Sequence, residues 1–97
     1  MGQKAEETLD ISFDEFSNYL RAHTRIFMDV EGGSYYLTHT DGYWRVQDCA
    51  VMNDKGHFTD CSDLVPTLSE FLGLTWLDGK KIEDVFDEST FYKSIQD

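Results

Sequence analysis

Apolar residues recur with two different spacings along the chain, and the change of spacing separates a helix from a set of strands. After residue 12, Phe16 and Leu20 follow the spacing of one helix face. Ser12 and Glu15 match a capping box, in which each side chain bonds the other residue's backbone N–H. Ile11 can pack on Phe16 as a hydrophobic staple. The pattern predicts a helix over residues 12–23.

Four later segments alternate apolar and polar residues, which is the two-residue period of a β-strand. They cover residues 25–30, 34–40, 43–52 and 57–61. The residues between them favour turns: Gly32-Gly33, Asp41-Gly42, and Asn53 to Gly56. The first two pairs suit two-residue hairpin loops, and the third suits a three-residue loop with a bulge. The sequence therefore predicts a four-stranded antiparallel meander.

The loop lengths also predict which residues stand opposite each other. The expected cross-strand partners are Val30 and Tyr35, Met28 and Leu37, Ile26 and His39, Leu37 and Val46, His39 and Trp44, Met52 and Phe58, and Ala50 and Asp60. With this register, all three loops place apolar residues on one face: Ile26, Met28, Val30, Tyr35, Leu37, Trp44, Val46, Ala50, Met52 and Phe58. We expect this face to pack against the helices.

Helical patterns follow the meander at residues 66–72 and 82–86. Residues 91–95 fit either a helix or a strand, and we favour the helix. Residues 1–10 have no apolar pattern and are expected to form a flexible tail. The 97 residues suit a single domain, which we place at 11–97. The predicted fold class is α+β in the order α-β-β-β-β-α-α, with two or three short C-terminal helices on one sheet face. Residues 1–10 lack the apolar core of a signal peptide, so we expect a cytoplasmic protein.

The opposite face of the predicted sheet is the first candidate for a binding surface. It carries Phe27, Tyr36, Tyr43, Arg45 and Gln47, and aromatic residues and arginine are enriched at the centres of protein interfaces. In the alternative interpretation, these aromatic residues only stabilise the sheet through cross-strand contacts. The composition favours this face as a partner-binding surface.

The charge of the chain limits the class of partner. The sequence has 19 acidic and 8 basic residues, a net charge of −11. Nucleic acids and anionic lipids attract basic surfaces, so we expect neither direct nucleic-acid binding nor membrane binding. The remaining interpretations are a basic protein partner and a surface that simply maintains solubility.

Two thiols and one histidine are the candidates for reactive or metal-binding groups. The predicted register places Cys49 opposite Cys61, as a reduced thiol pair or, under oxidising conditions, a disulfide. His57 lies four residues from Cys61 along an extended strand, roughly 13 Å at about 3.3 Å per residue. This distance is too long for a shared zinc ion or a catalytic dyad, so no metal site is predicted.

An alternative pocket is predicted at one end of the apolar face, from Tyr35, Asp48 and Asp60. Two carboxylates beside a phenol and an apolar wall can divide the roles of acid and base between them. This arrangement would indicate a ligand-binding domain or a small enzyme. In the simpler alternative, the carboxylates lie at the rim and cap the following helix.

The chain contains no phosphate-binding loop, zinc motif or nucleophile elbow, and no cofactor is predicted. Inhibitors, immunity proteins and nucleic-acid mimics share its small size and acidity. The sequence therefore favours a non-enzymatic binding protein that engages a basic protein through the open sheet face. A homodimer formed through that face is an alternative.

Overall fold

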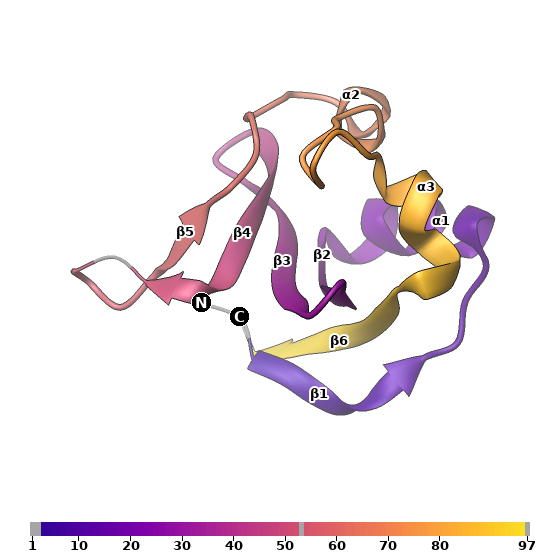
Figure 1. The fold of residues 1–97 in the computed structure, drawn as a ribbon, viewed down its shortest axis with the longest axis horizontal. Coiled ribbons are helices and arrows are strands. Elements are labelled where there is room, and N and C mark those ends of the chain that lie inside the picture. The colour runs from indigo at the N-terminus through magenta and orange to yellow at the C-terminus, as the bar shows by residue number, and fades with distance from the viewer. Residues whose placement is uncertain (1–2, 53, 97) are drawn as a thin grey trace.

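The structure of the protein is a computed structural model that describes residues 3–52 and 54–96. Its elements in chain order are β1 (Gln3–Leu9), α1 (Phe13–His23), β2 (Arg25–Val30), β3 (Gly33–Thr40), β4 (Tyr43–Met52), β5 (Phe58–Asp60), α2 (Leu68–Leu72), α3 (Ile82–Val85), the 3₁₀ helix η1 (Phe86–Glu88) and β6 (Thr90–Gln96). Figure 1 shows the sheet with the helices gathered on one side of it. Within the described residues, no helix is both long and apolar enough to cross a lipid bilayer.

The sheet has six antiparallel strands in the order β1-β6-β2-β3-β4-β5. The predicted α+β class is confirmed, and the four predicted strands lie side by side as β2 to β5. The predicted element order is wrong at both ends of the chain. Residues 3–9 form β1 rather than a frayed tail, and residues 90–96 form β6 rather than a helix. β6 lies between β1 and β2, so the two ends of the chain pair with each other.

Helix α1 begins as the capping box predicted. The Ser12 backbone N–H donates to Glu15 Oε1 at 2.9 Å, and the Glu15 N–H donates to Ser12 Oγ at 3.2 Å. The helix ends at a left-handed residue, Thr24, whose N–H donates to the Leu20 carbonyl. Phe16 and Leu20 are fully buried, so this helix presents the predicted face to the core.

The first two hairpins keep the predicted faces, although the first loop is displaced. The β3–β4 turn falls at Asp41-Gly42 with positive φ at both residues, and the pairs of Leu37 with Val46 and of His39 with Trp44 are confirmed. The β2–β3 turn uses Glu31-Gly32 instead of Gly32-Gly33 and pairs Val30 with Gly33. The predicted partners across β2 and β3 are therefore wrong by two residues, which is a full strand period and leaves each side chain on its predicted face.

The third hairpin contains a register shift that the sequence did not reveal. Met52 pairs with Phe58 as predicted, but Asp48 pairs with Thr59 and Gln47 with Asp60. The predicted pair of Ala50 and Asp60 is therefore wrong. Because the shift is an odd number of residues, the β5 residues change face relative to the prediction. The side chain of Met52 and the turn residue Asn53 lie outside the part of the chain that the structure describes.

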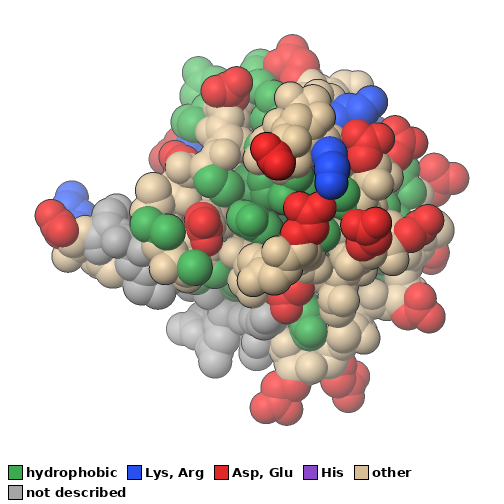
Figure 2. Space-filling view, in the orientation of Figure 1, with side chains coloured by type: hydrophobic (Ala, Val, Ile, Leu, Met, Phe, Trp, Pro, Cys, Tyr) green, Lys and Arg blue, Asp and Glu red, His purple; other side chains and the backbone are tan. Residues whose placement is uncertain are grey.

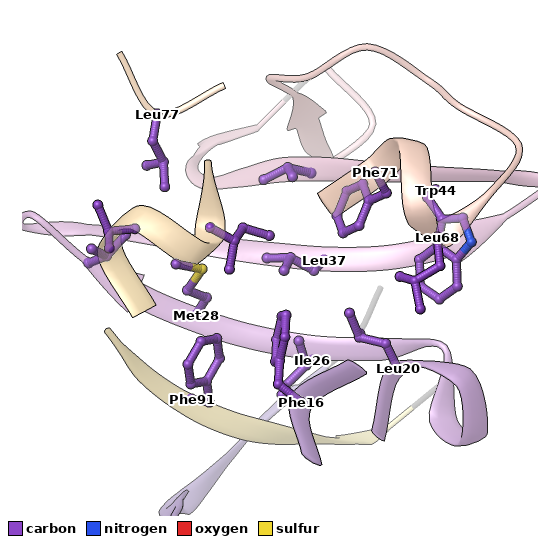
Figure 3. Packing of buried hydrophobic residues seen from close by; sticks show 14 residues of the cluster. Phe16, Leu20, Ile26, Met28, Leu37, Trp44, Leu68, Phe71, Leu77 and Phe91 are labelled. Atoms are coloured by element: carbon purple, nitrogen blue, oxygen red, sulfur yellow. The ribbon is translucent and has the colours of Figure 1, made fainter. Parts of the chain in front are cut away.

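The helix-covered face carries the main core, which Figure 3 shows at close range. The Trp44 ring stacks on Phe71 of α2 with centroids 5.6 Å apart, and Phe16 of α1 lies 4.8 Å from Phe91 of β6. The buried cluster is completed by residues from the three α-helices, from β2, β3 and β4, and from the segment between α2 and α3: Leu20, Ile26, Met28, Val30, Leu37, Val46, Leu68, Leu77, Ile82 and Val85. Phe58 and Ala50, which were predicted on this face, are not among its buried residues.

The second face of the sheet is curled and partly filled, so it is not the open face that the sequence suggested. Phe58 of β5 lies 6.5 Å from Phe27 of β2 and 6.0 Å from Tyr36 of β3, measured between ring centroids. In a flat sheet, β2 and β5 would lie about 14 Å apart, three strand spacings. The curvature brings the three rings together, and only 4% of Phe27 and 6% of Tyr36 remain exposed.

Candidate protein interface

The structure divides the predicted partner-binding residues into a buried group and an accessible group. Phe27 and Tyr36 are covered by the Phe58 ring and contribute little surface. Tyr43 is 45% exposed, and Arg45 and Gln47 are half-buried between it and the aromatic cluster. Of these five residues, Tyr43 exposes the most surface for contact with another molecule.

Arg45 and Gln47 are held in place by Asp60. Arg45 Nη1 lies 3.4 Å from Asp60 Oδ2, and Gln47 Nε2 donates to Asp60 Oδ1 at 3.0 Å. Arg45 Nη2 also donates to the Thr40 carbonyl at 3.1 Å, and the Arg45 side chain is 15% exposed. The Asp60 carboxylate therefore joins β4 to β5 on the second face.

This position of Asp60 separates it from the other two residues of the predicted alternative pocket. Tyr35 and Asp48 are cross-strand partners on the helix-covered face, as predicted. Burial, followed by the negative charge of Asp48, raises the pKa of the Tyr35 phenol. The ring of Tyr35 packs edge-on against Trp76 at 4.8 Å, and Asp48 Oδ1 accepts a hydrogen bond from the Ala50 N–H. The two carboxylates thus attach to opposite faces of the sheet, because Asp60 pairs with Gln47.

An exposed apolar pair lies beside β4 that the sequence reading did not identify. The segment after β5 returns along β4 through two backbone hydrogen bonds between Trp44 and Val65, at 2.7 and 3.2 Å. Trp44 and Val65 both pack on the core, so Tyr43 and Leu64 point to the opposite side. Leu64 is 44% exposed. The signal for this arrangement was the adjacent pair Leu64-Val65, of which an extended chain can bury only one.

We call this surface the Tyr43 patch and define it by two apolar residues and three exposed carboxylates: Tyr43, Leu64, Asp41, Asp60 and Asp63. The hydrogen bonds between Trp44 and Val65 hold the backbone beneath both apolar residues. The patch therefore combines an aromatic anchor and an aliphatic neighbour with an acidic rim.

A hollow of about 500 Å³ lies next to the Tyr43 patch, between residues 60–63 and residues 74–76. We call it the Cys61 cleft. Its lining includes Cys61, Asp63, Leu74 and Trp76. Burial, followed by the negative charges of Asp48 and Asp60, raises the pKa of the Cys61 thiol to about 11. The thiol is therefore protonated at neutral pH and is a poor nucleophile.

The predicted cross-strand pairing of Cys49 with Cys61 is wrong. The Cys61 N–H donates to the Val46 carbonyl at 2.8 Å, so Cys61 stands opposite Val46 and not opposite Cys49. The register shift in β4 causes this displacement. Both cysteines are free thiols in this structure. Among the described residues, no group of three or more His, Cys, Asp or Glu side chains is placed to hold a metal ion.

Carboxylates dominate the surface, as Figure 2 shows for one face of the molecule. The exposed acidic residues are Glu6, Glu7, Asp10, Asp14, Glu15, Glu31, Asp41, Asp54, Asp60, Asp63, Glu70, Asp78, Glu83, Asp84, Asp87 and Glu88. Arg45 forms an ion pair with Asp60, and Lys80 forms one with Glu31. Even if every lysine and arginine paired with one carboxylate, an excess of eleven negative charges would remain.

Comparisons with protein-family models, with the sequences of characterised proteins and with solved structures found no match to this chain.

Proposed function

We propose that this chain is a non-enzymatic binding protein that engages a basic protein partner through the Tyr43 patch. The observation that carries the proposal is the exposure of Tyr43 and Leu64 on the same side of the β4 edge, together with the exposed carboxylates of Asp41, Asp60 and Asp63. Two features predicted from the sequence are retained in this proposal: an acidic protein that binds a partner, and the second face of the sheet as the side that binds. It moves the contact from the buried rings of Phe27 and Tyr36 to the accessible end of that face.

The charge of the chain supports a basic partner. Complementary charges accelerate encounter between two proteins and select against partners of like charge. A surface with eleven excess negative charges attracts a basic protein over a distance that shortens as salt is added. Binding through this field therefore has to weaken with ionic strength.

The geometry of the patch supports tight local contact. Tyrosine is over-represented among the residues that contribute most to binding, because its ring buries a large area with few rotatable bonds. The Trp44 and Val65 hydrogen bonds fix the backbone that carries Tyr43 and Leu64. Little conformational freedom is then lost when a partner covers the two side chains.

The two alternatives fit the geometry less well. An acid–base site needs both carboxylates near one substrate, whereas Asp48 and Asp60 belong to opposite faces of the sheet. A homodimer through the Tyr43 patch would bring the carboxylates of Asp41, Asp60 and Asp63 against the same residues of a second copy. Like charges placed together across an interface disfavour association.

The test begins with a partner captured at low salt, identified, purified and mixed again with the protein in a binding titration. We expect Tyr43→Ala to weaken the purified complex by about 2 kcal/mol, roughly thirtyfold in Kd. We also expect the association rate to fall about tenfold between low and physiological salt. Val51→Ala is the matched control, because Val51 is a 50% exposed apolar residue on the same strand but at its other end. Equal affinities of the Tyr43 and Val51 variants would place the interface elsewhere.

A further inference from the structure

Strand β5 is weakly attached to the rest of the molecule. It has three residues and lies at the edge of the sheet (Figure 1). Its ladder with β4 is interrupted over residues 49–51. Between residues 54 and 60, every residue is exposed except Gly56 and Phe58, which are partly buried. Edge segments that bury little apolar surface open locally at a lower free energy than the core, so β5 is expected to open before the central strands.

The ring of Phe58 covers a row of aromatic residues on the second face. Its centroid lies 6.5 Å from that of Phe27 and 6.0 Å from that of Tyr36, and both ring pairs are steeply inclined. The rings of Phe27 and Tyr36 lie 4.5 Å apart on neighbouring strands. Tyr92 of β6 pairs with Phe27 from the other side and shares its face. We call Tyr92, Phe27 and Tyr36 the aromatic row, which loses its cover when β5 moves away.

A polar contact ties β5 to β4 beside this ring. Asp60 Oδ1 accepts a hydrogen bond from Gln47 Nε2 at 3.0 Å, and Asp60 Oδ2 lies 3.4 Å from Arg45 Nη1. Tyr36 pairs with Gln47 and Gln47 with Asp60, so one line of cross-strand partners leads from the aromatic row to the Tyr43 patch. A cationic group that contacts the patch competes with Arg45 for the Asp60 carboxylate, because charge-assisted hydrogen bonds use the same oxygen atoms. Binding at the patch therefore loosens the tie.

We propose that β5 is a lid over a concealed binding site, in which the aromatic row receives an aromatic side chain of the partner in place of Phe58. This inference rests on the proposed function, because it names a second group of the partner that binds next to the Tyr43 patch. The position of Phe58 shows that a six-membered ring fits against Phe27 and Tyr36. Aromatic rings also attract each other beyond the effect of buried area. A polar side chain would lose its hydrogen bonds to water against these rings, and the net charge of −11 disfavours an anion.

Hydrogen exchange of the unmodified protein, followed by NMR at neutral pH without denaturant, tests whether the lid opens. We expect the β5 amides to show protection factors of about 10²–10³, which corresponds to an open population of about 0.1–1%. The amides of the central strand β3 should be protected at least about tenfold more. Asp60→Asn removes the charge that Arg45 contacts and should accelerate exchange in β5 about threefold to tenfold. Asp63→Asn removes another exposed carboxylate of the patch and is the matched control, for which no change is expected.

The concealed site is tested with N-acetyl-tryptophanamide, which is titrated into the ¹⁵N-labelled protein. Phe58→Ala removes the ring that occupies the site. We expect this variant to bind the probe at least about tenfold more tightly than the unmodified protein, because a closed lid reduces the apparent affinity by the open fraction. The signals of the aromatic row should shift on binding. N-acetyl-leucinamide and N-acetyl-argininamide should bind more weakly, because neither supplies an aromatic ring. Phe58→Leu carries the same titration if the alanine variant does not fold.

Three results would overturn the inference: protection of the β5 amides equal to that of β3, no binding of the tryptophan probe to the Phe58 variants, or equal binding of the three probes. These outcomes are separate from that of the proposed function. If β5 stays closed but Tyr43→Ala still weakens the purified complex, only the lid is wrong. If the lid opens and the probe binds but Tyr43→Ala has no effect on the complex, only the patch is wrong.

Discussion

Truncation of Phe58 tests the curled sheet, on which the position of the accessible surface depends. Phe58 is partly buried and its ring contacts Phe27 and Tyr36 across the second face. Truncation of a fully buried phenylalanine to alanine costs about 3–5 kcal/mol. Since Phe58 keeps some exposure but also shields two other rings, we expect Phe58→Ala to lower the free energy of unfolding by about 2 kcal/mol.

Urea denaturation followed by circular dichroism measures this loss. For a domain of this size, the same change lowers Tm by about 10 °C. Phe58→Leu keeps most of the apolar volume and should cost about half as much. Val51→Ala is the control within the same hairpin and is expected to change stability by less than about 0.5 kcal/mol, because Val51 is exposed. If Phe58→Ala behaves like Val51→Ala, the ring points into solvent, and the second face is open as the sequence first suggested.

Two further predictions concern the capping box and the cleft thiol. Ser12→Ala removes the hydroxyl that accepts from the Glu15 N–H and should lower the free energy of unfolding by about 1 kcal/mol in the same urea assay; no measurable loss would show that the cap is not formed in solution. In a Cys49→Ser background, Cys61 should react with iodoacetamide more slowly in the folded protein than in urea, and its rate should rise only as the pH approaches about 11. Because the pKa of the Cys61 thiol is raised on folding, the folded protein holds this proton more tightly than the unfolded chain. The thiol therefore contributes fully to the free energy of unfolding below the usual thiol pKa of 9.0, and this contribution is lost as the pH rises towards about 11. Equal alkylation rates in the folded and unfolded protein would contradict the protonated thiol.

Local features of the chain were predictable because their causes lie within a few residues. The capping box of α1 depends on Ser12 and Glu15 alone, and both hydrogen bonds are present. The turn at Asp41-Gly42 follows from two residues that tolerate positive φ. The displaced first turn left the faces unchanged, because a shift of two residues preserves the alternation of side chains. The helix-covered face around Leu37, Trp44 and Val46 was therefore predicted correctly.

The candidate site was predicted only in part, since it depends on pairings between distant segments. A register shift in β4 moved Asp60 and Phe58 to the second face, and no turn residue marks that shift. As a result, the pocket of Tyr35, Asp48 and Asp60 is divided, and two of the predicted binding residues, Phe27 and Tyr36, are covered.

The amino-acid sequence by itself determined the helix start, the strand alternation, one apolar face and the strong negative charge, because each depends on neighbouring residues or on composition. The tertiary structure alone decided that both chain ends join the sheet, that β5 curls over the second face and that Leu64 lies on the same side of the β4 edge as Tyr43. Residues 3–9 carry little apolar signal and become a strand only when β6 offers backbone partners. Such pairing is non-local: its hydrogen bonds and buried rings form only after the chain has brought distant segments together, and no short stretch of sequence encodes them.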